Sequence, residues 1–320
     1  MHLSEDTYLV TGAMGCLGSW VIRQLLEDDC QVVAFDISEE DHRHRLIIDS
    51  LDREQICYIK GDLTDIEQVM SVVKGVSRII HLGALQVPFC KADRPMGALV
   101  NVVGTVNIFE AALHHSIEHL VYASSVAAFG NAEDFESKII LPNDPRLPTT
   151  LYGIWKYTNE LTARIFEADY GLPSIGLIPH TIYGPGRDQG LTSQPTSAIL
   201  AAVRRNSFHI GYGGRLALQF APDAARDFIG ASRLTPDGSE IHGLGGTLAS
   251  ISEFVAGIRE VTGFDEVTHG EEPLPFPEGV SSASLEQRLG TLSYTPLVES
   301  IECTARWFEE AVTRGLPLPA

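Results

Sequence analysis

A tyrosine and a lysine four residues apart, Tyr152 and Lys156, have the types and spacing needed for proton transfer. They open a stretch predicted to be a helix running to about Tyr170, and residues four apart lie on one face of a helix. A phenol, whose ordinary pKa is about 10, is a poor base at neutral pH, but a neighbouring ammonium favours its anion. The pair is therefore predicted to exchange a proton with a ligand; the alternative is a chance pair on an exposed helix.

A second candidate group, Ser125, stands at the carboxyl end of a predicted strand over residues 120–125. A serine hydroxyl there can polarise a substrate oxygen while Tyr152 moves the proton. These roles require that the strand end and the start of the Tyr152 helix meet at one place in the fold.

A glycine-spaced turn over residues 11–18 lies between the apolar run 8–10 and a helix-like run 19–26. Such a turn lets a pyrophosphate approach bare backbone and the free N–H groups of a helix start. The alternative is a flexible loop without a ligand. The turn residues predicted to contact a dinucleotide are Gly12, Met14, Gly15, Cys16, Leu17 and Gly18.

A second predicted strand, residues 32–35, ends at Asp36, which lies 24 residues after Gly12. That separation is close to the roughly 20 residues at which a carboxylate reaches the adenosine ribose of a bound dinucleotide. The carboxylate accepts from both ribose hydroxyls and repels a 2′-phosphate, so we predict NAD in preference to NADP. With an oxidised nicotinamide as hydride acceptor, the Tyr–Lys pair predicts oxidation of a secondary alcohol.

Two further predicted strands, residues 56–59 and 78–82, end at the same edge of the sheet, because strands that alternate with helices at this spacing form a parallel, doubly wound sheet. Ligands bind at the carboxyl ends of such strands. For the residues that follow the strand 56–59, the alternative to a cofactor contact is that Thr64 or Asp65 merely caps the next helix. The residues here that are predicted to border the cofactor are Asp62, Leu63, Leu82, Gly83 and Ala84.

We therefore predict an α/β fold: a Rossmann-like doubly wound parallel sheet with a smaller C-terminal substrate domain. The NAD-binding domain is expected over residues 1–178, with late strand and helix segments from about 216–242. The substrate-binding domain is expected over residues 179–215 and 243–320, and its loop 184–196 holds polar donors for a hydroxylated substrate.

Three segments between the strands are predicted from pattern alone. The charged segment 39–53 is predicted to be a surface helix whose basic residues form a solvated face. Residues 85–94 are predicted to form a loop, and a long helix over about 96–115 follows it. The loop residues that face the substrate, or are exposed incidentally, are Gln86, Cys90 and Lys91.

The composition argues against several classes of protein. A formal net charge of −19 and a pI near 4.9 argue against a nucleic-acid partner, because phosphate binding needs a basic surface. The five cysteines form no C-x-x-C pair and the eleven histidines mark no cluster, so no metal site and no disulfide framework is predicted. No apolar run approaches the roughly 18 residues of a membrane span, and the polar N-terminus favours a cytoplasmic enzyme without a membrane partner.

Several short motifs in chain order carry a family resemblance: residues 11–18, 61–63, 81–84, 101–105, 124–125, Tyr152 with Lys156, 182–187 and 218–223. Together they resemble the extended short-chain dehydrogenase/reductases, more narrowly an NAD-dependent epimerase/dehydratase, over nearly the whole chain. The resemblance implies that Ser125, Tyr152 and Lys156 are catalytic and that the lysine also holds the nicotinamide ribose. It adds Asn101 and His180 to the expected cofactor contacts. It also implies a homodimer formed through the helices near 96–115 and 150–170.

Two departures from the family pattern bear on the substrate. The Asn often found before the family's Tyr-Gly-Pro-Gly is replaced, since this chain has His180 nearby. Nucleotide-sugar members often carry an Arg-Asp-Phe run that holds a diphosphate, where this chain has residues 216–218, Leu-Ala-Leu, one position after Arg215. A one-residue shift along a strand points a side chain to the other face. The residues predicted to contact substrate are Gln86, Ser125, Tyr152, Arg187 and Arg215.

The predicted activity is that of an NAD-dependent oxidoreductase or epimerase acting on a secondary alcohol of a sugar or sugar-derived compound. A free sugar, sugar acid or related hydroxy compound is favoured as substrate. Dehydration is the least expected outcome, because Ser125 is followed by Val126-Ala127 where dehydratases of the family usually have Asp-Glu. The alternatives are a nucleotide-sugar 4-epimerase and a non-catalytic NAD-binding regulatory protein.

Overall fold

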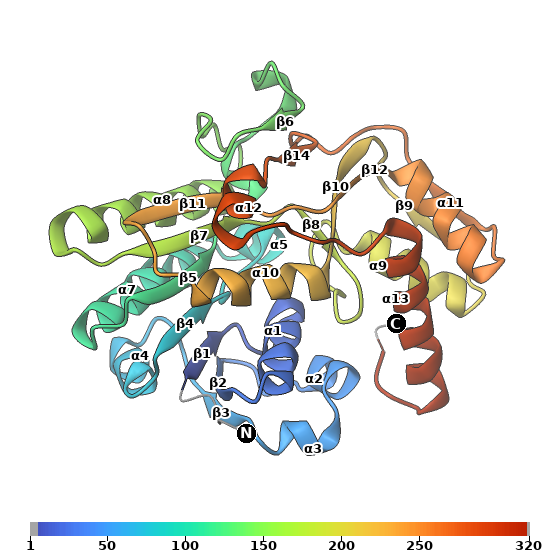
Figure 1. Ribbon diagram of the computed structural model, residues 1–320. Helices are drawn as coiled ribbons and strands as arrows, with labels where there is room; N and C mark the ends of the chain where they lie inside the picture. Colours follow the sequence, from blue (N-terminus) through green and yellow to red (C-terminus); the bar gives the residue numbers. More distant parts are fainter. Residues whose placement is uncertain (1–5, 319–320) are drawn as a thin grey trace.

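The computed structural model describes residues 6–318, and a seven-stranded sheet of parallel strands forms its centre (Figure 1). The strands lie in the order β11-β7-β5-β4-β1-β2-β3, so the chain starts in the middle, builds one edge and then crosses β1 to build the other half. This order is that of a doubly wound sheet, which confirms the predicted fold class. The strands are β1 (Thr7–Thr11), β2 (Gln31–Asp36), β3 (Cys57–Lys60), β4 (Arg78–His81), β5 (His119–Ala123), β7 (Ser174–Ile178) and β11 (Ser239–Gly243).

Strand β1 shows how the sequence fills both faces of this sheet. Tyr8 and Val10 point into a core that includes α1 (Cys16–Glu27) and α10 (Ala221–Arg233), whereas Leu9 points into a separate core. Alternate residues of a strand face opposite sides, and all three of these side chains are buried. The helices of the second core are α4 (Ile66–Val73), α7 (Gly104–His114) and α8 (Leu151–Tyr170).

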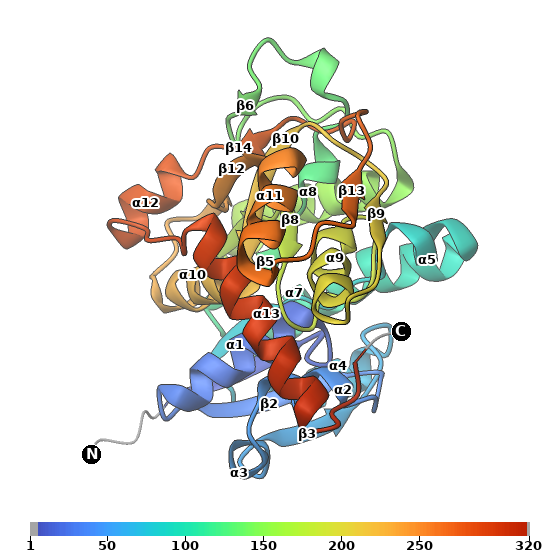
Figure 2. The ribbon, with the colours of Figure 1, turned by 90° about the vertical axis from the view of Figure 1, so that its right-hand side faces the viewer.

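The smaller part of the molecule is built on a three-stranded sheet in the order β12-β10-β8 (Figure 2). The strand expected near residue 216 lies in this smaller sheet, whereas α10 and β11, which follow it, return to the large one. The strands outside the large sheet are β6 (Ile139–Ile140), β8 (Thr181–Tyr183), β9 (Phe208–Ile210), β10 (Arg215–Phe220), β12 (Thr247–Ser250), β13 (Val267–His269) and β14 (Gly279–Val280). Apart from α10, the helices that follow β8 in the chain are α9 (Gln194–Val203), α11 (Ile251–Thr262), α12 (Ala283–Leu289) and α13 (Leu297–Thr313).

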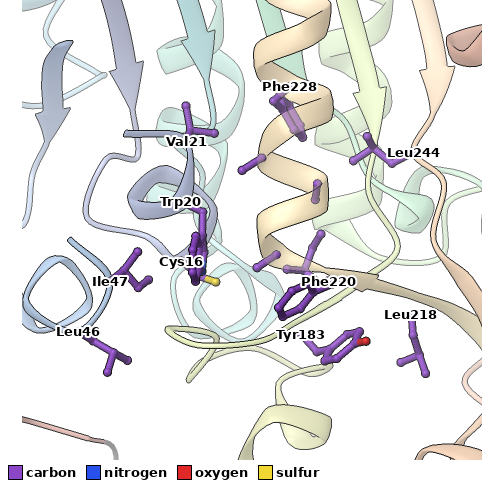
Figure 3. Packing of buried hydrophobic residues seen from close by; sticks show 14 of the residues in the cluster. Cys16, Trp20, Val21, Leu46, Ile47, Tyr183, Leu218, Phe220, Phe228 and Leu244 are labelled. Carbon is purple, nitrogen blue, oxygen red and sulfur yellow. The ribbon is translucent and has the colours of Figure 1, made fainter. Parts of the chain in front are cut away.

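One hydrophobic core joins the two parts (Figure 3). Trp20 of α1, Tyr183 of β8 and Phe220 of β10 belong to it, and the last two rings have centroids 5.8 Å apart. The indole Nε1 of Trp20 also donates to the carbonyl oxygen of Pro185 at 2.9 Å. The helix after the glycine turn and the loop after β8 are therefore held directly against each other.

The segment 39–53 differs from the surface helix that its charge pattern predicts. It forms two short helices, α2 (His42–Ile47) and α3 (Ser50–Arg53). His44 is fully buried with both ring nitrogens hydrogen-bonded, and the side chain of Arg43 is only 13% exposed. The predicted solvated basic face is wrong for these two residues, because α2 packs under the glycine turn.

The next deviations lie between β4 and β5. Val87–Ala92 forms helix α5, so the predicted loop over 85–94 is wrong. The following helix starts as α6 (Arg94–Ala98) and passes through a π-helical turn, Leu99–Val103, before it continues as α7. Contrary to expectation, Arg94–His114 is long and apolar enough to cross a membrane by length and composition. Half of its apolar window is buried inside the protein, and core helices of folded domains pass the same test.

Candidate active site

A cavity of about 700 Å³ lies at the carboxyl ends of the central strands. The chain leaves β1 and β4 toward opposite halves of the sheet, and such a point is where doubly wound sheets bind ligands. Most of the site residues predicted from the sequence lie in its wall. They are Gly12, Met14, Gly15, Cys16, Leu17, Gly18, Asp36, Asp62, Leu63, Leu82, Gly83, Ala84, Gln86, Ser125, Tyr152, Lys156, His180 and Arg187.

The glycine turn has the geometry that a pyrophosphate needs. Gly12 has a φ of +65°, and a Cβ there would lie 2.7 Å from the backbone nitrogen of Gly83. Among the described residues, no side chain caps the N-terminus of α1 at Gly15, so the N–H groups of the first turn are left to bind a ligand. Backbone donors without partners at a helix start bind anions, and the residues of this turn therefore fit NAD.

Asp36 at the end of β2 joins the turn to the strand. The N–H of Met14 donates to Oδ2 at 2.9 Å, and the N–H of Ser38 donates to Oδ1 at 2.9 Å. Each carboxylate oxygen can accept a further bond. Asp36 thus fixes the turn and still presents acceptors to the cavity, as recognition of ribose hydroxyls requires.

Tyr152 and Ser125 are brought together by a close contact between α8 and the 3₁₀ turn Val126–Ala128. Thr150 caps α8 by accepting from the N–H of Gly153, which sets Tyr152 in the first helical turn. A Cβ on Gly153 would lie 2.1 Å from the carbonyl oxygen of Ala127, so only glycine lets the helix approach this far. The close approach places the Tyr152 phenol beside Ser125.

Burial dominates the electrostatics of Tyr152 and Lys156. It raises the pKa of Tyr152, against the opposing effects of a hydrogen bond to Ser125 and the positive charge of Arg187. The Nζ of Lys156 donates to the carbonyl oxygen of Ala123 at 2.7 Å, and burial lowers its pKa to about 8. The sequence predicts that the Lys156 ammonium favours the phenolate, and the structure adds the positive charge of Arg187, which acts in the same direction on the pKa of Tyr152.

A buried ion pair supports the strand end that precedes Ser125. Ser124 donates to Glu160 at 2.5 Å, and Arg146 donates to the other carboxylate oxygen of Glu160 at 2.9 Å. The side chains of Arg146 and Glu160 are 3% and 1% exposed. Sequence reasoning missed this network; its one signal was that Glu160 lies four residues after Lys156, on the same face of the helix.

Two predicted contact residues do not line the cavity. Asn101 is buried in the π-helical turn, where its amide bonds the N–H and carbonyl groups of Leu85 at 2.7 and 2.9 Å. It therefore supports the loop before α5 instead of facing the cofactor directly. Arg215 has its side chain 46% exposed on β10, where it donates to the carbonyl oxygen of Leu248 at 3.1 Å. The register of β10 turns it away, as the one-residue shift suggested.

The two other residues of the 85–94 segment that were considered as substrate contacts lie outside the lining as well. Cys90 is 1% exposed, and its thiol donates to the carbonyl oxygen of Leu85. Lys91 is exposed on α5. The helix that replaces the expected loop accounts for both positions.

The substrate end of the cavity combines one cation with apolar side chains. The Nε of Arg187 is buried and finds no hydrogen-bond partner in the described part of the chain, and its Nη2 donates weakly to Thr192 at 3.3 Å. Sequence reasoning missed the apolar part, because it comes from segments that have no spacing relation to one another. The apolar residues of the lining in this region are Val87, Phe89, Met96, Leu191 and Phe276.

His180 borders the cavity beside a segment that folds back from the C-terminal part of the chain. Its Nε2 donates to the carbonyl oxygen of Pro277 at 2.8 Å, and burial lowers its pKa to about 4. The N–H of Ala217 in β10 donates to the carbonyl oxygen of Glu278 at 2.6 Å. The segment around Pro277 therefore covers both His180 and one edge of β10. Among residues 6–318, no group of three or more His, Cys, Asp or Glu side chains could hold a metal ion.

The comparison with protein families agrees with this geometry. Residues 8–232 match the NAD dependent epimerase/dehydratase family, which covers more than half of the chain. The chain therefore belongs to this family of extended short-chain dehydrogenase/reductases, as its motifs predict.

Three proteins illustrate the similarity. An uncharacterized 37.6 kDa protein in the cld 5′ region of Escherichia coli O111:H- is 32% identical over 223 residues, which are 64% of this chain and 63% of the relative. Uronate dehydrogenase of Pseudomonas syringae pv. tomato is 30% identical over 172 residues, 53% of this chain and 57% of its own. MoeE5 in complex with UDP-glucose and NAD is 25% identical with a TM-score of 0.81, covering 96% of this chain and 100% of MoeE5. The chain thus spans less than two thirds of the length of the two sequence relatives.

Proposed function

We propose that this protein oxidises a secondary alcohol of a sugar or sugar acid with NAD. The ketone is then released, as by a dehydrogenase, or reduced from its other face, as by an epimerase. The observation that carries the proposal is that Ser125, Tyr152 and Lys156 share one cavity with the glycine turn. A protein that only binds NAD as a regulator has no need of these three side chains at one place.

The three side chains divide the chemistry. The Ser125 hydroxyl donates to the reacting oxygen, and Tyr152 takes the proton of the substrate hydroxyl. The charge of Arg187 favours the phenolate that burial disfavours, and before substrate binds the hydrogen bond to Ser125 acts in the same direction. Lys156, held by Ala123, keeps its ammonium 5.7 Å from the centroid of the Tyr152 ring. Bound NAD would supply the acceptor for the hydrogen that leaves carbon as hydride.

The segment around Pro277 lies along one edge of β10, and this arrangement favours a compact substrate. Leu216 and Leu218 are 2% and 1% exposed, so both side chains belong to the core. They stand where the family resemblance would place the arginine of a diphosphate site. No residue of β10 lines the cavity, and the segment around Pro277 lies along the edge of that strand. A nucleotide diphosphate would have to displace the chain's own backbone here.

The position of Arg187 favours a substrate that carries an acidic group. Its guanidinium shares the cavity with Tyr152, and its Nε has no hydrogen-bond partner among residues 6–318. A carboxylate matches the planar fork of a guanidinium with two hydrogen bonds. A sugar acid is therefore favoured over a neutral sugar, and the similarity to a protein named uronate dehydrogenase points the same way.

A nucleotide sugar is the second candidate substrate, because MoeE5 was solved with UDP-glucose. Thermal-shift measurements in saturating NAD separate the two. We expect a hexuronic acid to raise the melting temperature and then to drive the appearance of reduced nicotinamide or of the epimer, whereas UDP, GDP and dTDP give no shift. Stabilisation by a nucleoside diphosphate but not by a hexuronic acid would make the nucleotide sugar the substrate. Absence of NAD binding would refute the proposed function as a whole.

We also propose that the protein is a homodimer. The π-helical turn and α8 lie next to each other and expose a row of apolar side chains that a second copy would bury. Ile165→Asp should give a monomer in sedimentation velocity, whereas Leu51→Asp, at an apolar and even more exposed position on α3, should leave the dimer intact. A monomeric wild type would contradict the proposal. The exposed residues of this row are Met96, Leu99, Val103, Leu161 and Ile165.

A further inference from the structure

A largely buried ion-pair cluster ties the glycine turn to the loop on the substrate side. Arg43 donates from Nη1 to the carbonyl oxygen of Met14 at 2.9 Å and from Nε to that of Gly186 at 3.2 Å. Its Nη2 and Nε also donate to Oδ1 of Asp188 at 2.6 and 3.0 Å. His42 Nε2 donates to Oδ2 of the same carboxylate at 2.8 Å. We call Arg43, Asp188 and His42 the clasp.

The clasp forms a wall of the cofactor end of the cavity. Arg43 and Asp188 line the main cavity together with Met14 and Asp36, which mark the end where the dinucleotide phosphates and ribose would lie. The clasp residues also line a second, small cavity behind them, so they separate the two spaces. With Arg43 13% and Asp188 10% exposed, the pair is screened little by solvent.

Breaking the clasp would leave charges without partners. Both oxygens of Asp188 are occupied, and without that carboxylate Arg43 keeps only carbonyl acceptors. Removing one member of a buried ion pair costs more than removing an exposed one, because the remaining charge stays out of water. Arg43 and Asp188 are 145 residues apart in the chain, so the clasp is a long-range tertiary contact.

We propose that the clasp closes the cavity over the bound dinucleotide and sets the rate at which it leaves. The proposal rests on the function proposed above, in which NAD occupies this cavity. In this proposal the dinucleotide held by the glycine turn leaves past Gly186 and Asp188, and the four hydrogen bonds from α2 to that loop have to open first. Retention of the cofactor is then a property of this loop as much as of the turn.

The same tie fixes the substrate arginine. Arg187 lies between Gly186 and Asp188, the two residues that the clasp holds. Opening the clasp therefore frees Arg187 from its position in the cavity. Loss of the clasp should weaken cofactor retention and substrate affinity together, whereas a tie that merely stabilises the fold would change the melting temperature alone.

The test is the dissociation rate of NADH from the purified protein, measured by stopped-flow fluorescence during displacement by excess NAD. Asp188→Asn keeps the size of the side chain and removes its charge, and we expect dissociation to become about tenfold faster or more. The matched control is Asp28→Asn, which breaks the exposed Arg233–Asp28 pair of 2.6 Å. It should stay within about twofold of the wild type.

A folded Asp188→Asn protein that releases NADH at the wild-type rate would overturn the clasp. If that variant does not fold, Arg43→Lys takes its place, because it keeps the charge but loses the planar fork, and the same rate criterion applies. Wild-type protein that binds no NADH would refute the proposed function and the clasp with it. If NADH binds and its dissociation rate is unchanged in the variant, only the proposed role of the clasp is refuted.

Discussion

The two ends of the cavity are built in different ways. The cofactor end comes mainly from the ends of neighbouring strands and one helix start, with the turn and Asp36 both inside residues 7–36. The substrate end comes from Gln86, the loop around Arg187, and Phe276, which are far apart in the chain. The turn and Asp36 of the cofactor end are therefore specified by local sequence, and only the clasp adds a long-range contact there, whereas the substrate end depends on long-range contacts throughout. Loops positioned on a rigid scaffold are where specificity commonly resides.

The ends also differ in what they offer a ligand. At the cofactor end, Asp36 already bonds two backbone N–H groups, and the donors are backbone groups of a helix start. At the substrate end, Arg187 presents a side-chain nitrogen that has no hydrogen-bond partner among the described residues. Backbone donors suit a cofactor shared by a family, and the cation at the substrate end is proposed to favour substrates of negative charge.

The largest effect is expected at Tyr152, which lies between the two ends of the cavity, and it should change catalysis without changing cofactor binding. Tyr152→Phe should lower kcat by roughly 10²–10⁴-fold, the range for a positioned acid or base, while NAD binding stays unchanged. Lys156→Met should weaken both, because its ammonium lies beside Tyr152 and the family resemblance places it on the nicotinamide ribose. Steady-state kinetics and calorimetry measure the two quantities. Nearly full activity of Tyr152→Phe would contradict the proton path.

At the substrate end, Arg187→Gln should raise KM for an acidic substrate by about 10–100-fold, the loss of charge-assisted hydrogen bonds. The dissociation constant for NAD should change little. Arg215→Gln is the matched control, because this arginine is exposed and outside the cavity. Equal effects of the two substitutions on KM would remove the assigned role of Arg187.

At the cofactor end, Asp36→Ala should weaken NAD binding by about tenfold, the loss of hydrogen bonds to a charged group, and should abolish the preference over NADP. Its control is Glu39→Ala, which removes an acidic side chain that is 73% exposed and paired with Lys60. Calorimetric titration with both cofactors gives the ratio. A preference that survives the loss of Asp36 would show that another group selects the cofactor.

The smallest effect concerns a buried histidine beneath the cofactor end. His81 bonds the hydroxyls of Thr11 and Thr105, and burial, with the charge of Lys156, lowers its pKa to about 3. Below the ordinary pKa of about 6.5, the unfolded chain binds a proton that the folded protein resists. Folding stability should therefore fall by about 1.4 kcal/mol per pH unit as pH decreases from about 6.

His81→Gln should lower the slope of the wild type by about 1.4 kcal/mol per pH unit, measured by urea unfolding between about pH 6 and pH 4, while the contribution of His180, whose pKa is also lowered by burial, remains. His209→Gln, at an exposed position on β9, should leave the slope unchanged. If both variants keep the acid-dependent slope of the wild type, His81 is not its source.

Most of the sheet and the cofactor end could be predicted from the sequence because each feature depends on neighbouring residues. A strand, a glycine turn and a helix start follow one another around Gly12, and alternation in β1 assigns its side chains to two faces. The burial of Arg43 and His44 could not be predicted, because their partners lie on other segments. The same holds for the Arg146–Glu160 pair. Charge alone suggests solvent, and only tertiary structure supplies the acceptors that let such groups be buried.

The π-helical turn Leu99–Val103 has a consequence for comparing this chain with its relatives. It buries Asn101 against Leu85 and turns Leu99 and Val103 outward. Each residue of a helix adds about 100° of rotation and 1.5 Å of rise, so deleting one residue here would rotate α6 by about 100° relative to α7. A one-residue gap at this point in a relative would therefore mark a different outer surface and a different support for the active-site loop, instead of a shortened connection.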